Sequence, residues 1–178
     1  MLKPFELNKN FIEQLISLIQ KKESLSIAKK LQEIHPADIA DIIEKLSGEH
    51  AQFLFEIFEN PKSADIIIEL DDNVRESILN ALTPKKIAKK IIGNLESDNA
   101  ADVISELPEE KKQKVLSHIE NKNQANDIAD LLNYDTEFAG SLMAKELIKV
   151  NENWTTVKCI REMRQQAEKI KSIHTIYV

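Results

Sequence analysis

Hydrophobic side chains recur along the first three quarters of the chain at intervals of three and four residues, the period of helices that bury one face. The pattern predicts a helix or a pair of helices over residues 11–31. Beyond residue 36 it predicts further helices of about 8–12 residues with connections of about 2–6. Three glycines and five prolines in 178 residues are few for a β-sandwich and fit packed helices. We therefore expect an all-α domain.

A four-residue unit, Ala-Asp followed by two apolar residues, recurs within this pattern. Its copies lie at residues 40–43, 64–67, 101–104 and 129–132, with a degenerate Ala-Lys-Lys-Ile copy at 88–91. Ala40, Ala64 and Ala88 are separated by 24 residues (64 − 40 and 88 − 64). Repeats of this length are typical of stacked helical hairpins, none of which can bury its apolar face alone. Thr83 before Pro84 has the form of a helix N-cap, and Ser97 is a further candidate cap.

The pattern changes near residue 134. Residues 147–150 form a short strand candidate, Thr155 or Thr156 can cap a following helix, and residues 176–178 give a second strand signal together with Ile173. The inner face of that helix is expected to consist of apolar residues, namely Val157, Ile160, Met163 and Ala167. A strand–helix–strand segment cannot bury its own sheet. We expect an α-helical domain over residues 1–133 and a truncated α/β domain over 134–178.

Charge and composition exclude several classes of protein. The net charge of −6 argues against nucleic acid as a partner, since such binders need a basic stripe. A single cysteine, Cys159, allows no disulfide within the chain and fits a reducing compartment. The first residues lack a signal-peptide layout, and the apolar runs are too short to span a membrane. The sequence as given therefore predicts a soluble cytoplasmic polypeptide.

One segment is unusually acidic. Between Lys90 and Lys111 there are no basic residues and six carboxylates: Glu96, Asp98, Asp102, Glu106, Glu109 and Glu110. A helix would stack Asp98, Asp102 and Glu106 at i, i+4 and i+8, where like charges destabilise it by about 0.2–0.5 kcal/mol per pair. These side chains are either solvated, with Asp98 favoured by the helix dipole, or they bind a divalent cation. Carboxylate oxygens point to magnesium or calcium rather than zinc or copper.

Asp65 occupies the equivalent acidic place of an earlier repeat, and the same two interpretations apply to it. The sequence contains no glycine-rich phosphate loop, no nucleophile elbow and no carboxylate pair in a catalytic setting. The four histidines have no metal-ligand spacing. We therefore expect a protein that is not an enzyme.

Three segments together carry a resemblance to a known family. Residues 34–40 read Ile-His-Pro-Ala-Asp-Ile-Ala, the Ala-Asp units follow, and residues 132–143 place Tyr and acidic residues before Ala-Gly-Ser-Leu-Met. They resemble the cytosolic part of the MgtE family of magnesium transporters, in which the last segment leads into a cystathionine-β-synthase-type (CBS) domain. Residues 156–157 and 176–178 fit the first helix and the next strand of that domain. Phe138 departs from the small residue or Thr usual in the family.

The resemblance implies a right-handed superhelical, armadillo-like N domain, then a pair of CBS domains and a membrane pore, assembled as a homodimer in a bacterial cell membrane. The N domain would face the cytoplasm and sense Mg²⁺, because ions that bridge it to the CBS domains favour the closed pore. By this resemblance the metal ligands are Asp65, Asp98 and Asp102. Asp65 stands where some relatives have Glu.

A second interpretation stays open from the sequence. Stacked hairpins of this kind also resemble the middle domain of flagellar motor switch proteins, a scaffold that binds proteins and no ion. The residues do not separate magnesium from manganese or calcium, since all three accept carboxylate oxygen. Half a CBS domain is not expected to hold a nucleotide.

Overall fold

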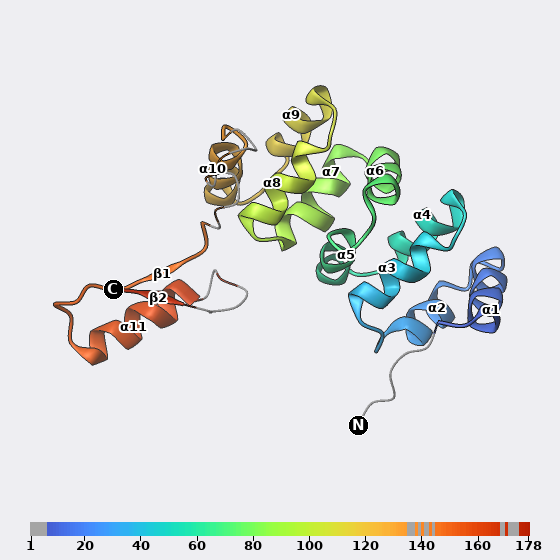
Figure 1. Cartoon of the computed structure of the whole chain (residues 1–178), viewed down its shortest axis with the longest axis horizontal. Helices are drawn as coiled ribbons and strands as arrows, with labels where there is room; N and C mark the ends of the chain where they lie inside the picture. The colour runs from blue at the N-terminus through green and yellow to red at the C-terminus, as the bar shows by residue number, and fades with distance from the viewer. Residues whose placement is uncertain are drawn as a thin grey trace. The chain divides into compact units, whose positions relative to one another are not determined.

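Short helices make up most of the computed structural model, which describes residues 7–134, 138, 140, 143, 145–167, 170 and 175–178 (Figure 1). The first elements are α1 (Lys9–Gln20), α2 (Ser24–Leu31), α3 (Pro36–Glu44), α4 (Gly48–Ile57), α5 (Asn60–Ile67), α6 (Asp72–Ala81), α7 (Pro84–Lys86), the π-helical η1 (Ile87–Ile91) and the 3₁₀-helical η2 (Ile92–Asn94). They are followed by α8 (Ser97–Ser105), α9 (Glu109–Ser117), α10 (Lys122–Leu131), β1 (Ile148–Lys149), α11 (Thr156–Ala167) and β2 (Ile176–Tyr177). The predicted all-α array of short helices is confirmed.

The chain packs as two compact units, which are described separately. One consists of Met1–Leu95 and Glu106–Glu120, and the other of Glu96–Ser105 and Asn121–Val178. Helix α8 packs against α10 within the second unit. The predicted domain boundary between residues 133 and 134 stays a prediction, and most of the predicted connector into a CBS domain lies outside the described residues.

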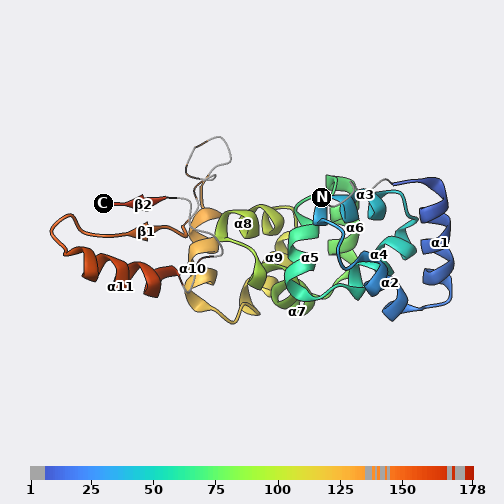
Figure 2. The same cartoon turned by 90° about the horizontal axis from the view of Figure 1, so that it is seen from below.

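The 24-residue repeat appears in the packing of the first unit. Helix α3 packs on α5, both labelled in Figure 2, and α5 packs on η1, so that equivalent helices of successive repeats are neighbours. The alanines that open the repeat, Ala40, Ala64 and Ala88, are 1%, 0% and 2% exposed. In the second unit Ala101 is buried as well, whereas Ala129 is exposed. The last predicted copy therefore keeps the sequence of the repeat but not its packing.

Three lysines join helices of the first unit that are distant in sequence. In each case the ε-ammonium donates to two carbonyl oxygens at the C-terminal end of another helix. The pairs are Lys62 with Leu31 and Gln32 at the end of α2, Lys90 with Phe55 and Glu56 on α4, and Lys111 with Leu79 and Asn80 on α6. A cation at this end of a helix is stabilising by about 0.3–1 kcal/mol. Burial lowers the pKa of all three amines, because leaving water disfavours the charged form.

The C-terminal segment forms the predicted strand–helix–strand arrangement. Strands β1 and β2 pair in parallel, with Ile148 opposite Ile176, and α11 lies between them in sequence and contacts β1. The predicted inner face of α11 is largely exposed, since Val157 and Ile160 are 80% and 44% accessible. A two-stranded sheet is too narrow to cover a helix of this length. Ile173 lies outside the described residues.

In the described part of the chain, no helix combines the length and apolar character needed to cross a lipid bilayer.

Candidate metal site on helix α8

Helix α8 carries two of the three predicted ligands. Its buried side comprises Ser97, Ala100, Ala101, Val103 and Ile104. Burying these residues directs Asp98, which is partly exposed, and Asp102, which is exposed, away from the core. They are four positions apart, so both carboxylates lie on the same side of the helix. The structure thus places Asp98 and Asp102 on one helix; that they bind a metal stays a prediction.

Asp98 lies in the first turn of α8. One of its carboxylate oxygens, Oδ1, accepts the backbone N–H of Asn99 at 2.8 Å. Among the described residues, Asp98 forms no ion pair with a basic side chain. The carboxylate therefore retains acceptor capacity for a cation, while the N-terminal end of the helix dipole stabilises its negative charge by about 0.3–1 kcal/mol.

A third carboxylate, Glu146, meets the start of the same helix from a distant part of the chain. Its Oε1 accepts the backbone N–H of Ser97 at 2.9 Å, and its Oε2 accepts the Ser97 hydroxyl at 2.8 Å. Ser97 is thus the first residue of α8 and a buried donor to Glu146, and the predicted capping role passes to the glutamate. A capping interaction of this kind is worth about 0.5–2 kcal/mol.

Next to Glu146, Lys145 extends this attachment. Its backbone N–H donates to the Ser97 hydroxyl oxygen at 3.3 Å, and its ε-ammonium pairs with Asp130 on α10. The hydrogen bond to Asp130 raises the pKa of Lys145. Residues 145–146 therefore tie the segment before β1 to both α8 and α10. Sequence reasoning missed this attachment, because Ser97 and Glu146 are 49 positions apart and no periodic pattern links them.

The acidic run predicted as one stripe is divided in the structure. Helix α8 ends at Ser105, so Glu106 does not continue the stack of Asp98 and Asp102. Within the first unit, Glu106 instead accepts a two-pronged bond from Arg75, at 2.6 Å from Nη2 and 2.9 Å from Nε. This bond raises the pKa of the guanidinium.

The two glutamates that follow, Glu109 and Glu110, form ion pairs with Lys112 and Lys114 on their own helix. Half of the six carboxylates of the acidic run therefore pair with basic side chains.

Asp65, the third predicted ligand, lies on α5 in the first unit. Its neighbours Ala64, Ile66 and Ile67 are fully buried, and Asp65 itself is partly exposed. It occupies the position of the repeat that Asp102 occupies on α8, directly after a buried alanine. Its role as a ligand is likewise a prediction.

The chemistry of these donors fits a hard divalent cation. Magnesium is commonly held by one or two carboxylates and keeps several water molecules. Across the residues described, no group of three or more His, Cys, Asp or Glu is close enough to hold a metal ion. Helix α8 offers a pair of oxygen donors, which alone would hold such an ion only weakly.

Comparison with known proteins identifies the family. The family model described as the MgtE intracellular N domain matches residues 34–137, more than half of the chain. The chain belongs to the MgtE family. The predicted family resemblance is thereby confirmed, and so is the prediction that the chain is not an enzyme, since the relatives that share this domain are named magnesium transporters.

Two curated relatives extend the match beyond the N domain. The magnesium transporter MgtE of Thermus thermophilus is 26% identical over 162 residues, which cover 90% of this chain and 36% of the relative. The magnesium transporter MgtE of Bacillus subtilis is 25% identical over 167 residues, covering 94% of this chain and 37% of the relative. The chain thus spans little more than a third of the length of these transporters.

Solved structures agree with the fold. The cytosolic domain of the Mg²⁺ channel MgtE, determined in complex with ATP, matches with a TM-score of 0.81 and 25% identity, over 94% of this chain and 68% of that one. The soluble part of a magnesium transporter matches with a TM-score of 0.74 and 22% identity, over 94% of this chain and 65% of that one. The described architecture is that of the MgtE cytosolic domain.

Proposed function

We propose that this chain is the magnesium-sensing part of a bacterial magnesium transporter and that it lies on the cytoplasmic side of the membrane. Divalent cations would bridge its acidic surface to the CBS domains of the full-length protein and so favour closure of the pore. The complete protein would act as a homodimer. Residues 134–178 would be the connector and the beginning of the first CBS domain.

The observation that supports this proposal best is the pair of outward carboxylates on α8. Asp98 and Asp102 project from a helix whose opposite side is buried, and Asp98 has no basic partner among the described residues. Two carboxylates hold Mg²⁺ weakly, which suits a sensor that must release the ion when its concentration falls. Asp65 on α5 would supply a further ligand in the same way.

The mechanism is electrostatic. Without cations, the α8 carboxylates and an acidic CBS surface repel each other and stay apart. Mg²⁺ binds the docked state better than the undocked state and shifts the population toward docking. A shift from 1:99 to 99:1 needs about 10⁴-fold tighter binding to the docked state, more than one sparse site supplies. We therefore expect several ions to share the interface, with α8 and Asp65 contributing at different points.

The proposal is tested by joining the chain to a complete pair of CBS domains and following protease protection as Mg²⁺ is added. The parent protein should become protected, and the Asp98→Asn/Asp102→Asn variant should not, while circular dichroism shows unchanged helicity. A matched variant, Glu109→Gln/Glu110→Gln, removes two carboxylates that already have lysine partners and should respond like the parent. Equal protection of the Asp98→Asn/Asp102→Asn variant would rule out these residues as the sensor. A parent protein without any response would favour a protein-interaction scaffold.

A further inference from the structure

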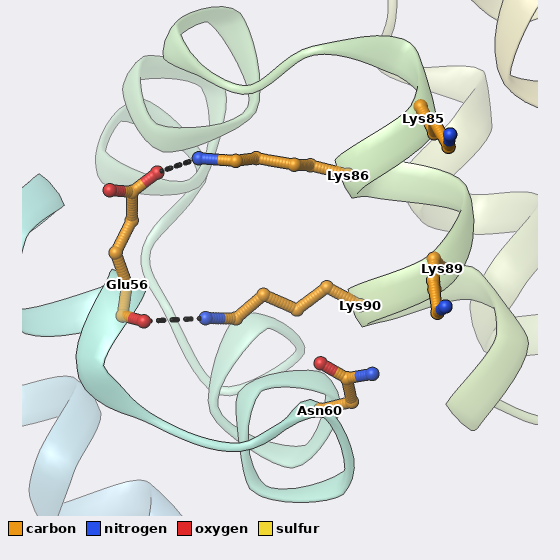
Figure 3. A pocket seen from close by; sticks show the side chains of 6 residues that line it. All are labelled: Glu56, Asn60, Lys85, Lys86, Lys89 and Lys90. Carbon is orange, nitrogen blue, oxygen red and sulfur yellow. Dashed lines mark hydrogen bonds and ion pairs between the residues drawn. The ribbon is translucent and has the colours of Figure 1, made fainter.

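A second charged surface, opposite in sign to α8, lies in the first unit. The end of α4, the start of α5 and the α7–η1 segment enclose a hollow of about 370 Å³. Its lining comprises Glu56, Asn60, Lys85, Lys86, Lys89 and Lys90, and we call it the lysine hollow (Figure 3). Four ammonium groups around one carboxylate are unexpected in a chain whose net charge is −6.

The local fold places the four lysines on one side of the segment. Ile87, Ala88 and Ile91 are at most 2% exposed and fix the opposite side in the core. The backbone from Ile87 to Ile91 is π-helical, a conformation that is rare in proteins and frequent at functional sites. The four lysines lie beside or between these buried residues in sequence, so their side chains face outward together.

Two of the lysines have structural roles. The Lys86 ammonium pairs with the Glu56 carboxylate at 2.6 Å. Lys90 donates to the carbonyl oxygens of Phe55 and Glu56 at 3.2 and 3.0 Å, and its ammonium lies 5.4 Å from the Phe55 ring centroid. Figure 3 shows both side chains reaching across to Glu56.

The other two lysines have no such role. In Figure 3 neither Lys85 nor Lys89 is joined to Glu56, and in the part of the chain that the structure describes their ammonium groups have no hydrogen bond or ion pair. The pairs Lys85–Lys89 and Lys86–Lys90 also place like charges at i and i+4, a spacing that destabilises a helix. Glu56 offsets only one of the four charges, and burial together with the neighbouring charge of Lys86 lowers the pKa of Lys90.

Comparison with the other repeats shows that packing does not require a positive charge at Lys89. Lys89 follows the buried Ala88, and the residues that follow the equivalent buried alanines are Asp41, Asp65 and Asp102. Packing thus accepts an acid or a base at this outward position. The structure accounts for Lys86 and Lys90 but leaves the positive charge of Lys85 and Lys89 without an internal function.

We propose that the lysine hollow binds a phosphate group. Ammonium groups are compact charges that bind phosphate oxygens, and each has three donors. The ammonium groups of Lys85 and Lys89 have no protein acceptor among the described residues and would each donate to the anion, while Lys86 retains two donors beyond Glu56. The Asn60 amide at the rim offers two neutral donors. The phosphate belongs either to a soluble compound or to the headgroup of an anionic lipid, since both present the same oxygens.

Amide chemical shifts during a titration with pyrophosphate, at constant ionic strength and without divalent cations, test the proposal. Residues 85–90 should show saturable shifts in the parent chain. Lys85→Gln/Lys89→Gln removes no contact that holds the fold, and it should weaken binding about tenfold or more, the effect of losing charged hydrogen bonds. The control Lys29→Gln/Lys45→Gln removes the same charge from exposed sites outside the hollow and should bind like the parent.

Vesicles distinguish the two sources. Co-sedimentation with phosphatidylglycerol vesicles but not with phosphatidylcholine vesicles, lost in Lys85→Gln/Lys89→Gln and kept in Lys29→Gln/Lys45→Gln, would identify a lipid headgroup. Saturable pyrophosphate binding without sedimentation would identify a soluble phosphate. If neither ligand binds, or if the two variants behave alike with both, the lysine hollow is not a phosphate site.

Discussion

Helix α8 and the α7–η1 segment contain equivalent parts of the repeat and carry opposite charges. In α8 the exposed Asp102 follows the buried Ala101, and in η1 the exposed Lys89 follows the buried Ala88. Both segments bury isoleucine within the next four residues, so their inner faces are alike. Packing therefore fixes the inner positions of this repeat and leaves the charge of the outward position open to function.

The largest expected difference in stability is between substitutions at an inner and an outward position of α8. Ile104 is fully buried, and Ile104→Ala should lower the free energy of unfolding by about 2–5 kcal/mol, through lost burial and the cavity left behind. Asp102→Asn should change it by no more than about 0.5 kcal/mol, as expected for an outward surface position. Urea unfolding followed by circular dichroism measures both. Effects of similar size would mean that Asp102 belongs to the packing of the helix.

The two ion pairs formed by Glu106 and Glu110 should contribute differently to the free energy of unfolding. Arg75→Met leaves the Glu106 carboxylate, 29% exposed, without its two-pronged donor and should cost about 1–3 kcal/mol of stability. Lys114→Met breaks the solvent-exposed pair with Glu110 and should leave the free energy of unfolding nearly unchanged. Chemical unfolding of the two variants in parallel decides the matter. A loss no larger for Arg75→Met than for Lys114→Met would place Glu106 with the solvated acids.

The start of α8 depends on a carboxylate from the C-terminal segment. Glu146→Ala removes both acceptors of Ser97 and should cost about 0.5–2 kcal/mol, the range for losing a helix cap. Amide hydrogen exchange should speed up in the first turn of α8. Glu152→Ala, at an exposed position of the same segment, serves as the control and should leave those rates unchanged. Unchanged exchange in both variants would refute the capping role of Glu146.

The smallest expected change in stability distinguishes Lys90 from Lys89 in the lysine hollow. Lys90→Met should cost about 0.3–1 kcal/mol through the lost contact with the end of α4, and Lys89→Met close to nothing. Burial sets the pKa of Lys90 below its unfolded value. Between those two values the unfolded chain binds more protons, so this group's contribution to stability rises with pH.

Carbon-detected NMR titration of the folded and the urea-unfolded chain measures the Lys90 difference directly, and Lys90→Met should remove the corresponding rise in stability. A pKa that is equal in the two states would contradict the burial of this amine.

The sequence predicted those features that depend on local periodicity. The buried alanines of three repeats, the helix pair at the N-terminus and the strands near residues 148 and 176 each leave a pattern within a short window. The position of Asp98 and Asp102 on one helix is a local feature too, because the periodicity of that helix is visible in a short window.

The bonds that join distant segments left no such pattern. Lys62, Lys90 and Lys111 cap helices more than 30 residues upstream, and Arg75 and Glu106 are 31 residues apart. Their side chains are ordinary surface residues in sequence, and only the stacking of the repeats brings them to their partners. The acidic stripe was overestimated for the same reason, because the partner of Glu106 lies in another helix.

Paramagnetic line broadening by Mn²⁺, which accepts the same carboxylate oxygens as Mg²⁺, tests the central claim most directly. In the parent chain, amide signals of residues 97–103 should broaden at the lowest Mn²⁺ concentrations and recover when Mg²⁺ is added in excess. Those of residues 85–90 should stay sharp, and Asp98→Asn/Asp102→Asn should abolish the broadening on α8. Broadening that begins at other acidic residues, or that persists on α8 in this variant, would show that Asp98 and Asp102 do not bind the cation.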